Sequence, residues 1–257
     1  MKNFIGLCLL TLLLNSCATK KEIVYFYEGK EVLEGSKNLL DYEPKIEKND
    51  VLRINVSSSS INEEIVKPFQ MRMGEQQGGA GRQDPSLSGY LVSPDGIINF
   101  PVLGKVEVVG LTRTELQDKL ENRIQDYVKE PIVDVRIVNF SVTVLGEVGS
   151  PGRIQITDGR ITMPELIAMV GDISYNGKRE NITIIRETEG VKKIGTIDMT
   201  DTSLFSSEFF YLKQNDIVYV EPTYRAVKSA GFFTSYQGII SLGTTIIGIY
   251  VLINSLK

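Results

Sequence analysis

The sequence predicts an α+β protein, with two small domains of short strands and few helices followed by one long apolar helix. Three observations predict this class. Apolar and polar residues alternate in several short segments, two threonine–glutamate pairs have the spacing of helix starts, and residues 229–255 contain no charged side chain.

The alternating segments predict strands, most clearly at residues 50–56, 133–137 and 182–186. In the first of these, Leu52 and Ile54 lie on one face and the polar residues between them lie on the other. A period of two residues is typical of a strand with one buried face. We therefore expect these segments to form half-buried strands.

Two internal segments are predicted to be helices, and each begins with a capping box. In the first, Thr112 stands three residues before Glu115, and Pro131 ends the segment. Its expected apolar stripe consists of Leu116, Leu120, Ile124 and Tyr127. In the second, Thr162 stands three residues before Glu165, and Gly171 ends the segment. Its apolar residues are Leu166, Ile167, Met169 and Val170.

Two short motifs occur twice, which suggests two related α+β units. The motif at residues 102–106 recurs at 144–148, and the motif at residues 49–54 recurs at 215–220. We expect the units to comprise residues 42–140 and 141–224. Within the first unit, residues 67–88 are rich in Gly, Gln and Met and are expected to form a long flexible loop. That loop could contact a partner or be a solvent-exposed insertion.

The first residues resemble a bacterial lipoprotein signal. Lys2 precedes an apolar run that is too short to span a bilayer, and the run ends in Leu14-Asn15-Ser16-Cys17, which looks like a lipobox. Residues 1–16 are therefore expected to be a signal peptide, and Cys17 is the expected site of lipid attachment. The alternative is an ordinary secretory signal with an incidental cysteine.

Residues 17–41 are expected to form a tether between the lipid and the first unit. Ala18 follows the cysteine, which resembles the sorting pattern of lipoproteins of the outer membrane. The tether could carry one strand at Ile23–Tyr27, where its one short apolar run lies. Since Cys8 would leave with the signal peptide and Cys17 would carry lipid, no disulfide is expected.

Composition excludes several classes of function. The chain has no histidine, and both cysteines lie in the first 17 residues, so most nucleophilic triads and zinc sites are excluded. We expect no cofactor and no metal. A net charge of −4 without a basic block makes nucleic acid an unsuitable partner. A hydrolase that uses only carboxylates has scattered candidates, Asp84, Asp95 and Asp172, and we expect no enzyme.

Residues 229–255 are expected to form a transmembrane helix. A helix of this length would reach about 40 Å, more than the ~30 Å hydrocarbon core of a bilayer. Small or hydroxylated residues recur three and four apart, which makes one stripe along the helix. The stripe would either let helices from other copies of the chain approach closely or line a watery lumen. The alternative is a single-span or re-entrant anchor. The stripe consists of Gly231, Thr234, Gly238, Ser241, Thr245 and Gly248, with Leu252 and Ser255 continuing it.

Several of these residues resemble a known family. Residues 42–56, the run Gly89-Tyr90-Leu91-Val92-Ser93-Pro94-Asp95-Gly96-Ile97-Ile98-Asn99-Phe100-Pro101-Val102-Leu103-Gly104 and Gly110–Thr112 resemble the polysaccharide export domain of Wza-like outer-membrane exporters. Residues 142–152 and 214–220 resemble the β-grasp module, of the SLBB type, that follows in that family.

The resemblance implies a lipid-anchored protein of the outer membrane with most of its chain in the periplasm. Copies would form a ring there, and their C-terminal helices would form a channel for capsular polysaccharide or exopolysaccharide. An inner-membrane copolymerase, often a tyrosine kinase, would dock beneath the ring, and transport would be passive. The sequence holds one β-grasp module, so we expect a short periplasmic part. The alternative is a monomeric lipoprotein that binds glycan or another soluble ligand through that module.

Overall fold

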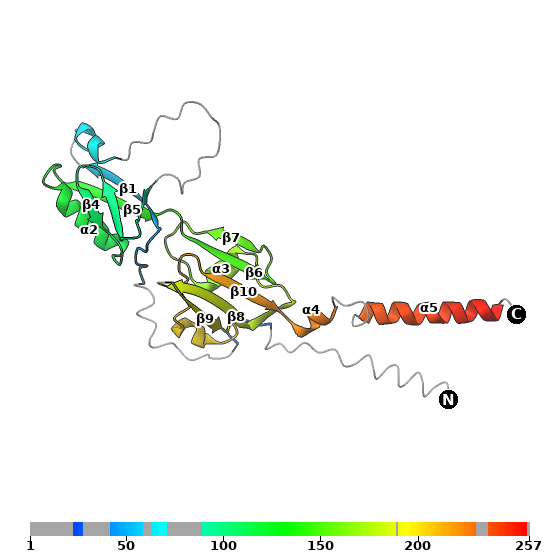
Figure 1. Cartoon of the computed structure of the whole chain (residues 1–257). Helices are drawn as coiled ribbons and strands as arrows, with labels where there is room; N and C mark the ends of the chain where they lie inside the picture. Colours follow the sequence, from blue (N-terminus) through cyan, green and yellow to red (C-terminus); the bar gives the residue numbers. More distant parts are fainter. Residues whose placement is uncertain are drawn as a thin grey trace, which may run out of the picture.

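The computed structural model describes residues 23–27, 42–58, 63–70, 89–188, 190–229 and 236–255 (Figure 1). In this part of the chain, two α+β units are followed by a long C-terminal helix, which confirms the predicted fold class.

The first unit contains a three-stranded antiparallel sheet in the order β2-β1-β5, a hairpin of β3 and β4, and helix α2. Its elements are β1 (Val51–Ser58), η3 (Glu63–Ile65), η4 (Lys67–Phe69), β2 (Tyr90–Leu91), β3 (Ile97–Phe100), β4 (Gly104–Glu107), α2 (Arg113–Ile124) and β5 (Pro131–Ile137).

The second unit is built on a five-stranded sheet in the order β7-β6-β10-β8-β9. Strands β6 and β10 are parallel, and the other neighbours are antiparallel. All three predicted strands are present, within β1, β5 and β8. The elements of this unit are β6 (Ser141–Gly146), β7 (Gly152–Gln155), α3 (Met163–Met169), β8 (Gly177–Thr188), β9 (Val191–Ile197), η6 (Thr202–Ser206) and β10 (Ile217–Pro222).

Both predicted capping boxes are confirmed. The hydroxyl of Thr112 accepts a hydrogen bond from the backbone N–H of Glu115, and Glu115 accepts one from the backbone N–H of Thr112. Thr162 and Glu165 make the same pair of bonds at the start of α3. These bonds satisfy backbone donors that a helix start otherwise leaves without partners.

Two residues of the predicted apolar stripes lie elsewhere. Helix α2 ends at Ile124, so Tyr127 falls in the turn beyond it and is exposed. The ring of Tyr127 lies beside that of Phe69, with 5.8 Å between the ring centroids. In α3 the buried side chains follow the i, i+3, i+4, i+7 pattern of one helix face, and Met169 is exposed because it is off that face. That buried face consists of Met163, Leu166, Ile167 and Val170.

Two segments differ from their predicted form. Residues 23–27 are not a strand but a turn in which Phe26 has a positive φ of 53°. This turn packs on the second unit, because the Phe26 N–H donates to Met199 O and the Phe26 ring stacks on Phe205. In the predicted loop 67–88, Lys67–Phe69 forms the short helix η4 and Phe69 is buried. Residues 71–88 lie outside the described residues.

One of the two repeated motifs is a repeated turn. Asn49 and Asn215 both have positive φ, at 68° and 62°, and each precedes a buried aspartate. Asp50 Oδ2 accepts a hydrogen bond from the backbone N–H of Glu47, and Asp216 Oδ2 accepts one from that of Lys213, both at 2.8 Å. The other repeat is not equivalent, because residues 102–106 form the turn of the β3–β4 hairpin and most of β4, whereas residues 144–148 include the end of strand β6.

The C-terminal part holds two helices, α4 (Tyr224–Ser229) and α5 (Tyr236–Ser255). In Figure 1, α5 extends away from the second unit, and its segment Gly238–Ser255 is almost wholly exposed. Among the described residues it is the one helix long and apolar enough to cross a membrane. The predicted helix 229–255 therefore corresponds to α5 from Tyr236 onward, and residues 230–235 lie outside the described residues.

A buried ion pair fixes the turn before β10. Asp216 is 0% exposed, and Arg186 on β8 binds it twice, from Nε to Oδ1 at 3.0 Å and from Nη2 to Oδ2 at 2.6 Å. The same guanidinium also donates to the carbonyl oxygens of Glu208 and Tyr211. One side chain therefore ties β8, the turn and the preceding loop together.

Replacing Arg186 by methionine should cost the full chain about 3–5 kcal/mol of unfolding free energy, because it leaves a buried carboxylate without its cation. The matched control is Lys193→Met, which faces Arg186 across the β8–β9 pair and forms an exposed ion pair with Glu208. The control should cost less than about 1 kcal/mol. Urea unfolding in detergent measures both, and equal losses would contradict the assignment.

Candidate functional site

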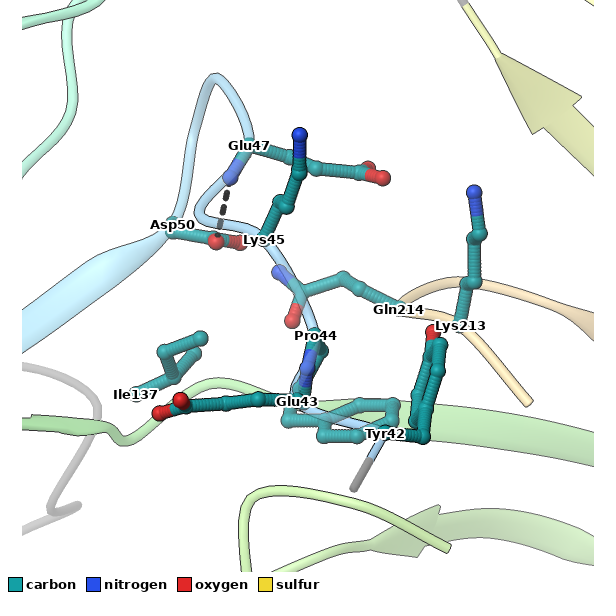
Figure 2. A pocket seen from close by; sticks show the side chains of 10 residues that line it. Tyr42, Glu43, Pro44, Lys45, Glu47, Asp50, Ile137, Lys213 and Gln214 are labelled. Carbon is teal, nitrogen blue, oxygen red and sulfur yellow. Dashed lines mark hydrogen bonds between the residues drawn. The ribbon is translucent and has the colours of Figure 1, made fainter. Parts of the chain in front are cut away.

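A cavity of about 210 Å³ lies where the two units meet (Figure 2). The chain leaves the first unit at Ile137 and enters the second at Ser141, and residues 42–50 run beside this connection. Both units contribute to the wall of the cavity. The lining residues are Tyr42, Glu43, Pro44, Lys45, Glu47, Asp50, Ile137, Phe140, Lys213 and Gln214.

Aromatic stacking and polar contacts hold the first lining residues in place. The ring of Tyr42 stacks on that of Tyr211 with 4.2 Å between centroids and 13° between planes. Arg160 in the second unit donates to the carbonyl oxygen of Tyr42 at 3.4 Å, and Glu43 pairs with Arg113 of α2 at 3.4 Å. The segment is thus attached to both units.

Asp50 is the unusual group of this cavity. It is 2% exposed, and while Oδ2 accepts the Glu47 N–H, Oδ1 has no hydrogen-bond partner among the described residues (Figure 2). Burial raises the pKa of the Asp50 carboxyl from 3.8 to about 7, and the nearby Glu47 carboxylate adds to the rise. Burial also raises the pKa values of Glu47 and Tyr42.

The contrast with Asp216 shows what is missing at Asp50. Both carboxylates sit in the same Asn-Asp turn and accept the same backbone bond. Arg186 neutralises Asp216, whereas no ion pair to Asp50 exists among the described residues. The cavity can therefore accept a hydrogen-bond donor at Asp50 Oδ1 and at Gln214 Oε1, which is also buried without a partner.

Among the described residues, the carboxylates considered as catalytic candidates are not brought together. Asp95 lies in an exposed turn before β3, and Asp172, which follows α3, accepts a hydrogen bond from the hydroxyl of Tyr25. These two acids therefore lie on different units, and Asp84 is outside the described residues. No group of three His, Cys, Asp or Glu side chains suited to a metal ion occurs within the described part of the chain.

Helix α5 carries four of the six stripe residues, and Cys17, Gly231 and Thr234 lie outside the described residues. The hydroxyl of Ser241 donates to Gly238 O at 2.8 Å, and that of Thr245 donates to Ser241 O at 2.7 Å. A Cβ added at Gly248 would meet nothing within 4 Å. The stripe is therefore open at Ser241, Thr245 and Gly248, while Gly238 is buried, and the two hydroxyls find acceptors within their own helix.

Sequence reasoning missed the junction cavity. The repeated Asn-Asp turn was visible in the sequence, but its second copy has an arginine partner 30 residues earlier in the chain. Only the folded chain reveals that the first copy lacks such a partner. The contact of Tyr25 with Asp172 and Arg179 was likewise not foreseen, because it joins segments that are distant in sequence.

Comparison with known protein families places two domains on this fold. Residues 40–138 match the model of the polysaccharide biosynthesis/export protein family, and residues 141–220 match the SLBB domain. These limits follow the first and second structural units. The first unit is thus similar to a polysaccharide export domain, and the second unit is similar to an SLBB domain.

The most similar curated relatives include two export proteins from Ralstonia. The EPS I polysaccharide export outer membrane protein EpsA of Ralstonia nicotianae is 39% identical over 42% of this chain and 29% of its own length. EpsA of Ralstonia solanacearum is 33% identical over 54% of this chain and 37% of its own length. The capsule polysaccharide export outer membrane protein CtrA of Neisseria meningitidis is 23% identical over 55% of this chain and 36% of its own length.

The chain therefore carries a domain of the polysaccharide biosynthesis/export protein family followed by an SLBB domain, and it is similar to polysaccharide export proteins of the outer membrane. The matches extend over about a third of the length of the curated relatives.

Replacing Asp50 by asparagine should flatten the pH dependence of unfolding. The pKa of Asp50 is raised in the folded state, so its contribution to the unfolding free energy is largest below about pH 4. This contribution is lost as the pH rises through about 7. The fall should be on the order of 3 kcal/mol in wild type and should be lost in Asp50→Asn.

Urea unfolding of the full chain across this pH range measures the effect. Asp126→Asn, which removes an exposed carboxylate, is the control for the loss of one charge. Parallel pH profiles for wild type and Asp50→Asn would show that Asp50 is not held in its protonated form.

Proposed function

We propose that this chain is a lipid-anchored outer-membrane protein whose copies assemble into a conduit for export of capsular polysaccharide or exopolysaccharide. The observation that carries the proposal is that an export domain and an SLBB domain are followed on one chain by the exposed apolar helix α5. The names of the relatives, which are polysaccharide export proteins of the outer membrane, support the substrate and the location.

The exposed surface of α5 supports assembly with other copies. Large apolar side chains such as Ile239, Ile246 and Ile249 are exposed around the helix, so it needs lipid or other helices as neighbours. A single helix encloses no passage, and several copies are needed to surround a polymer. Because the Ser241 and Thr245 hydroxyls are bonded within the helix, the stripe would act through close packing, not through hydrogen bonds between helices.

The proposed transport is passive. A hydrated polymer needs a closed wall that shields it from lipid, and this requires no covalent step. Residues 1–16 would be the signal peptide, Cys17 the lipid attachment site and residues 17–41 the tether. The periplasmic ring would be formed by residues 42–140 and 141–224 of each copy, and an inner-membrane copolymerase or tyrosine kinase would dock beneath it. The net charge of −4 disfavours nucleic acid as a partner.

The junction cavity supports a second candidate function. A monomeric lipoprotein could bind a glycan or another soluble ligand there, because Asp50 Oδ1 and Gln214 Oε1 offer two buried acceptors beside an aromatic ring. Hydroxyl groups of a sugar would supply the donors. The two candidates differ in oligomeric state and in their need for α5.

The first test is the mass of the detergent-extracted full chain by light scattering. A large discrete oligomer is expected, and a chain that stops after Tyr224 should be smaller, because it lacks α5. A monomer in both cases would favour the ligand-binding lipoprotein and contradict the conduit.

The second test alters the stripe. Replacing Gly238 and Thr245 by leucine should reduce both the oligomer and the glycan on the cell surface, because leucine keeps neighbouring helices apart. The matched control is Ile240→Leu with Ile247→Leu on the opposite face of α5, which changes the shape of two exposed side chains but not their volume. Unchanged assembly and unchanged surface glycan in the Gly238/Thr245 variant would refute the role of the stripe.

A further inference from the structure

Exposed tyrosines gather at the end of the second unit from which the chain continues to α5. Tyr175 is 86% exposed and Tyr224 is 79% exposed, and Tyr219 and Val227 are also exposed. We call these four residues the tyrosine patch. In Figure 1, α4 lies at this end of the β6–β10–β8 sheet and points toward α5.

Contacts across this end bring the patch together. Tyr175 belongs to the turn before β8, and the backbone N–H of Thr223 donates to the carbonyl oxygen of the neighbouring Asn176 at 2.6 Å. This bond brings the turn that carries Tyr175 to the start of the helix that carries Tyr224, although the two tyrosines are 49 positions apart in the sequence. Tyr219, Tyr224 and Val227 line a shared groove with Lys178, Glu221 and Pro222.

The chemistry of the patch suits the headgroup layer of a membrane. A tyrosine ring has an apolar body and a polar tip, and it is enriched where a bilayer meets water. The charges within the groove compensate each other, since Lys178 and Glu221 form an ion pair at 2.7 Å.

The chain itself limits how far the patch can lie from the bilayer. Helix α4 ends at Ser229 and α5 begins at Tyr236, and seven residues span at most about 25 Å when fully extended. If α5 crosses the membrane, the patch lies close to the membrane surface. Tyr127, another exposed tyrosine, lies on the first unit and is under no such limit.

We propose that the tyrosine patch contacts the phospholipid headgroup layer of the membrane that α5 crosses. This inference rests on the proposed membrane span of α5. The contact gives each chain a second attachment beside the helix, and it sets the tilt of the second unit against the membrane. The partner is thus a lipid surface, and a second copy of the chain covering the patch is the competing outcome.

A single tryptophan can report on the contact, because the chain contains none. We expect full-length Tyr175→Trp, reconstituted in phosphatidylethanolamine and phosphatidylglycerol vesicles, to show blue-shifted emission. Lipids brominated near the headgroup should reduce this emission roughly twofold, because the ring lies at that depth. The exposure of Tyr175 makes the substitution tolerable, and Tyr224→Trp is the second variant.

Two control variants separate the possible results. Tyr127→Trp should stay unquenched, and Ile246→Trp at the middle of α5 should be quenched by lipids brominated deep in their acyl chains. Quenching at Ile246→Trp but at neither patch position overturns the lipid contact and leaves the membrane span intact. Absence of quenching at all positions overturns the span as well. Blue-shifted but unquenched emission from the patch shows that protein covers it, and this also overturns the lipid contact.

Discussion

The bidentate ion pair between Arg186 and Asp216 is the interaction on which the second unit and the junction depend. Both groups are buried, so removing either one would leave a buried charge without its partner, and the guanidinium also binds two carbonyl oxygens of the loop before β10. That loop carries Tyr211, on which Tyr42 stacks to attach the linking segment. One charged side chain on β8 thereby holds the sheet, the turn and the contact between the two units.

The same turn in the first unit has a different electrostatic state. Asp50 repeats the backbone geometry of Asp216 but has no cation, so burial favours its protonated form. The contribution of Asp50 to folding stability therefore falls as its carboxyl group ionises. Helix α5 depends on its surroundings for a different reason, because its apolar surface is not covered by its own chain and must be covered by lipid or by other helices.

Local sequence patterns predicted many of the helices and strands. The capping boxes at Thr112 and Thr162 and the period-two segments predict elements that are present, because hydrogen bonds and side-chain periodicity over a few residues decide them. Tyr127 shows where local patterns fail. Its spacing fits the α2 stripe, but the helix ends at Ile124, and packing against Phe69 in another segment decides where the ring lies.

The sequence by itself determined the fold class, the family resemblance and the apolar length of the last helix, because each depends on neighbouring residues or on composition. Only the tertiary structure decided that Asp216 is paired and Asp50 is not, and that Thr223 before α4 is bonded to Asn176 in the turn before β8. These contacts join residues that are 30 and 47 positions apart, because the packing of whole strands brings distant parts of the chain together. A pattern within one segment carries no information about them.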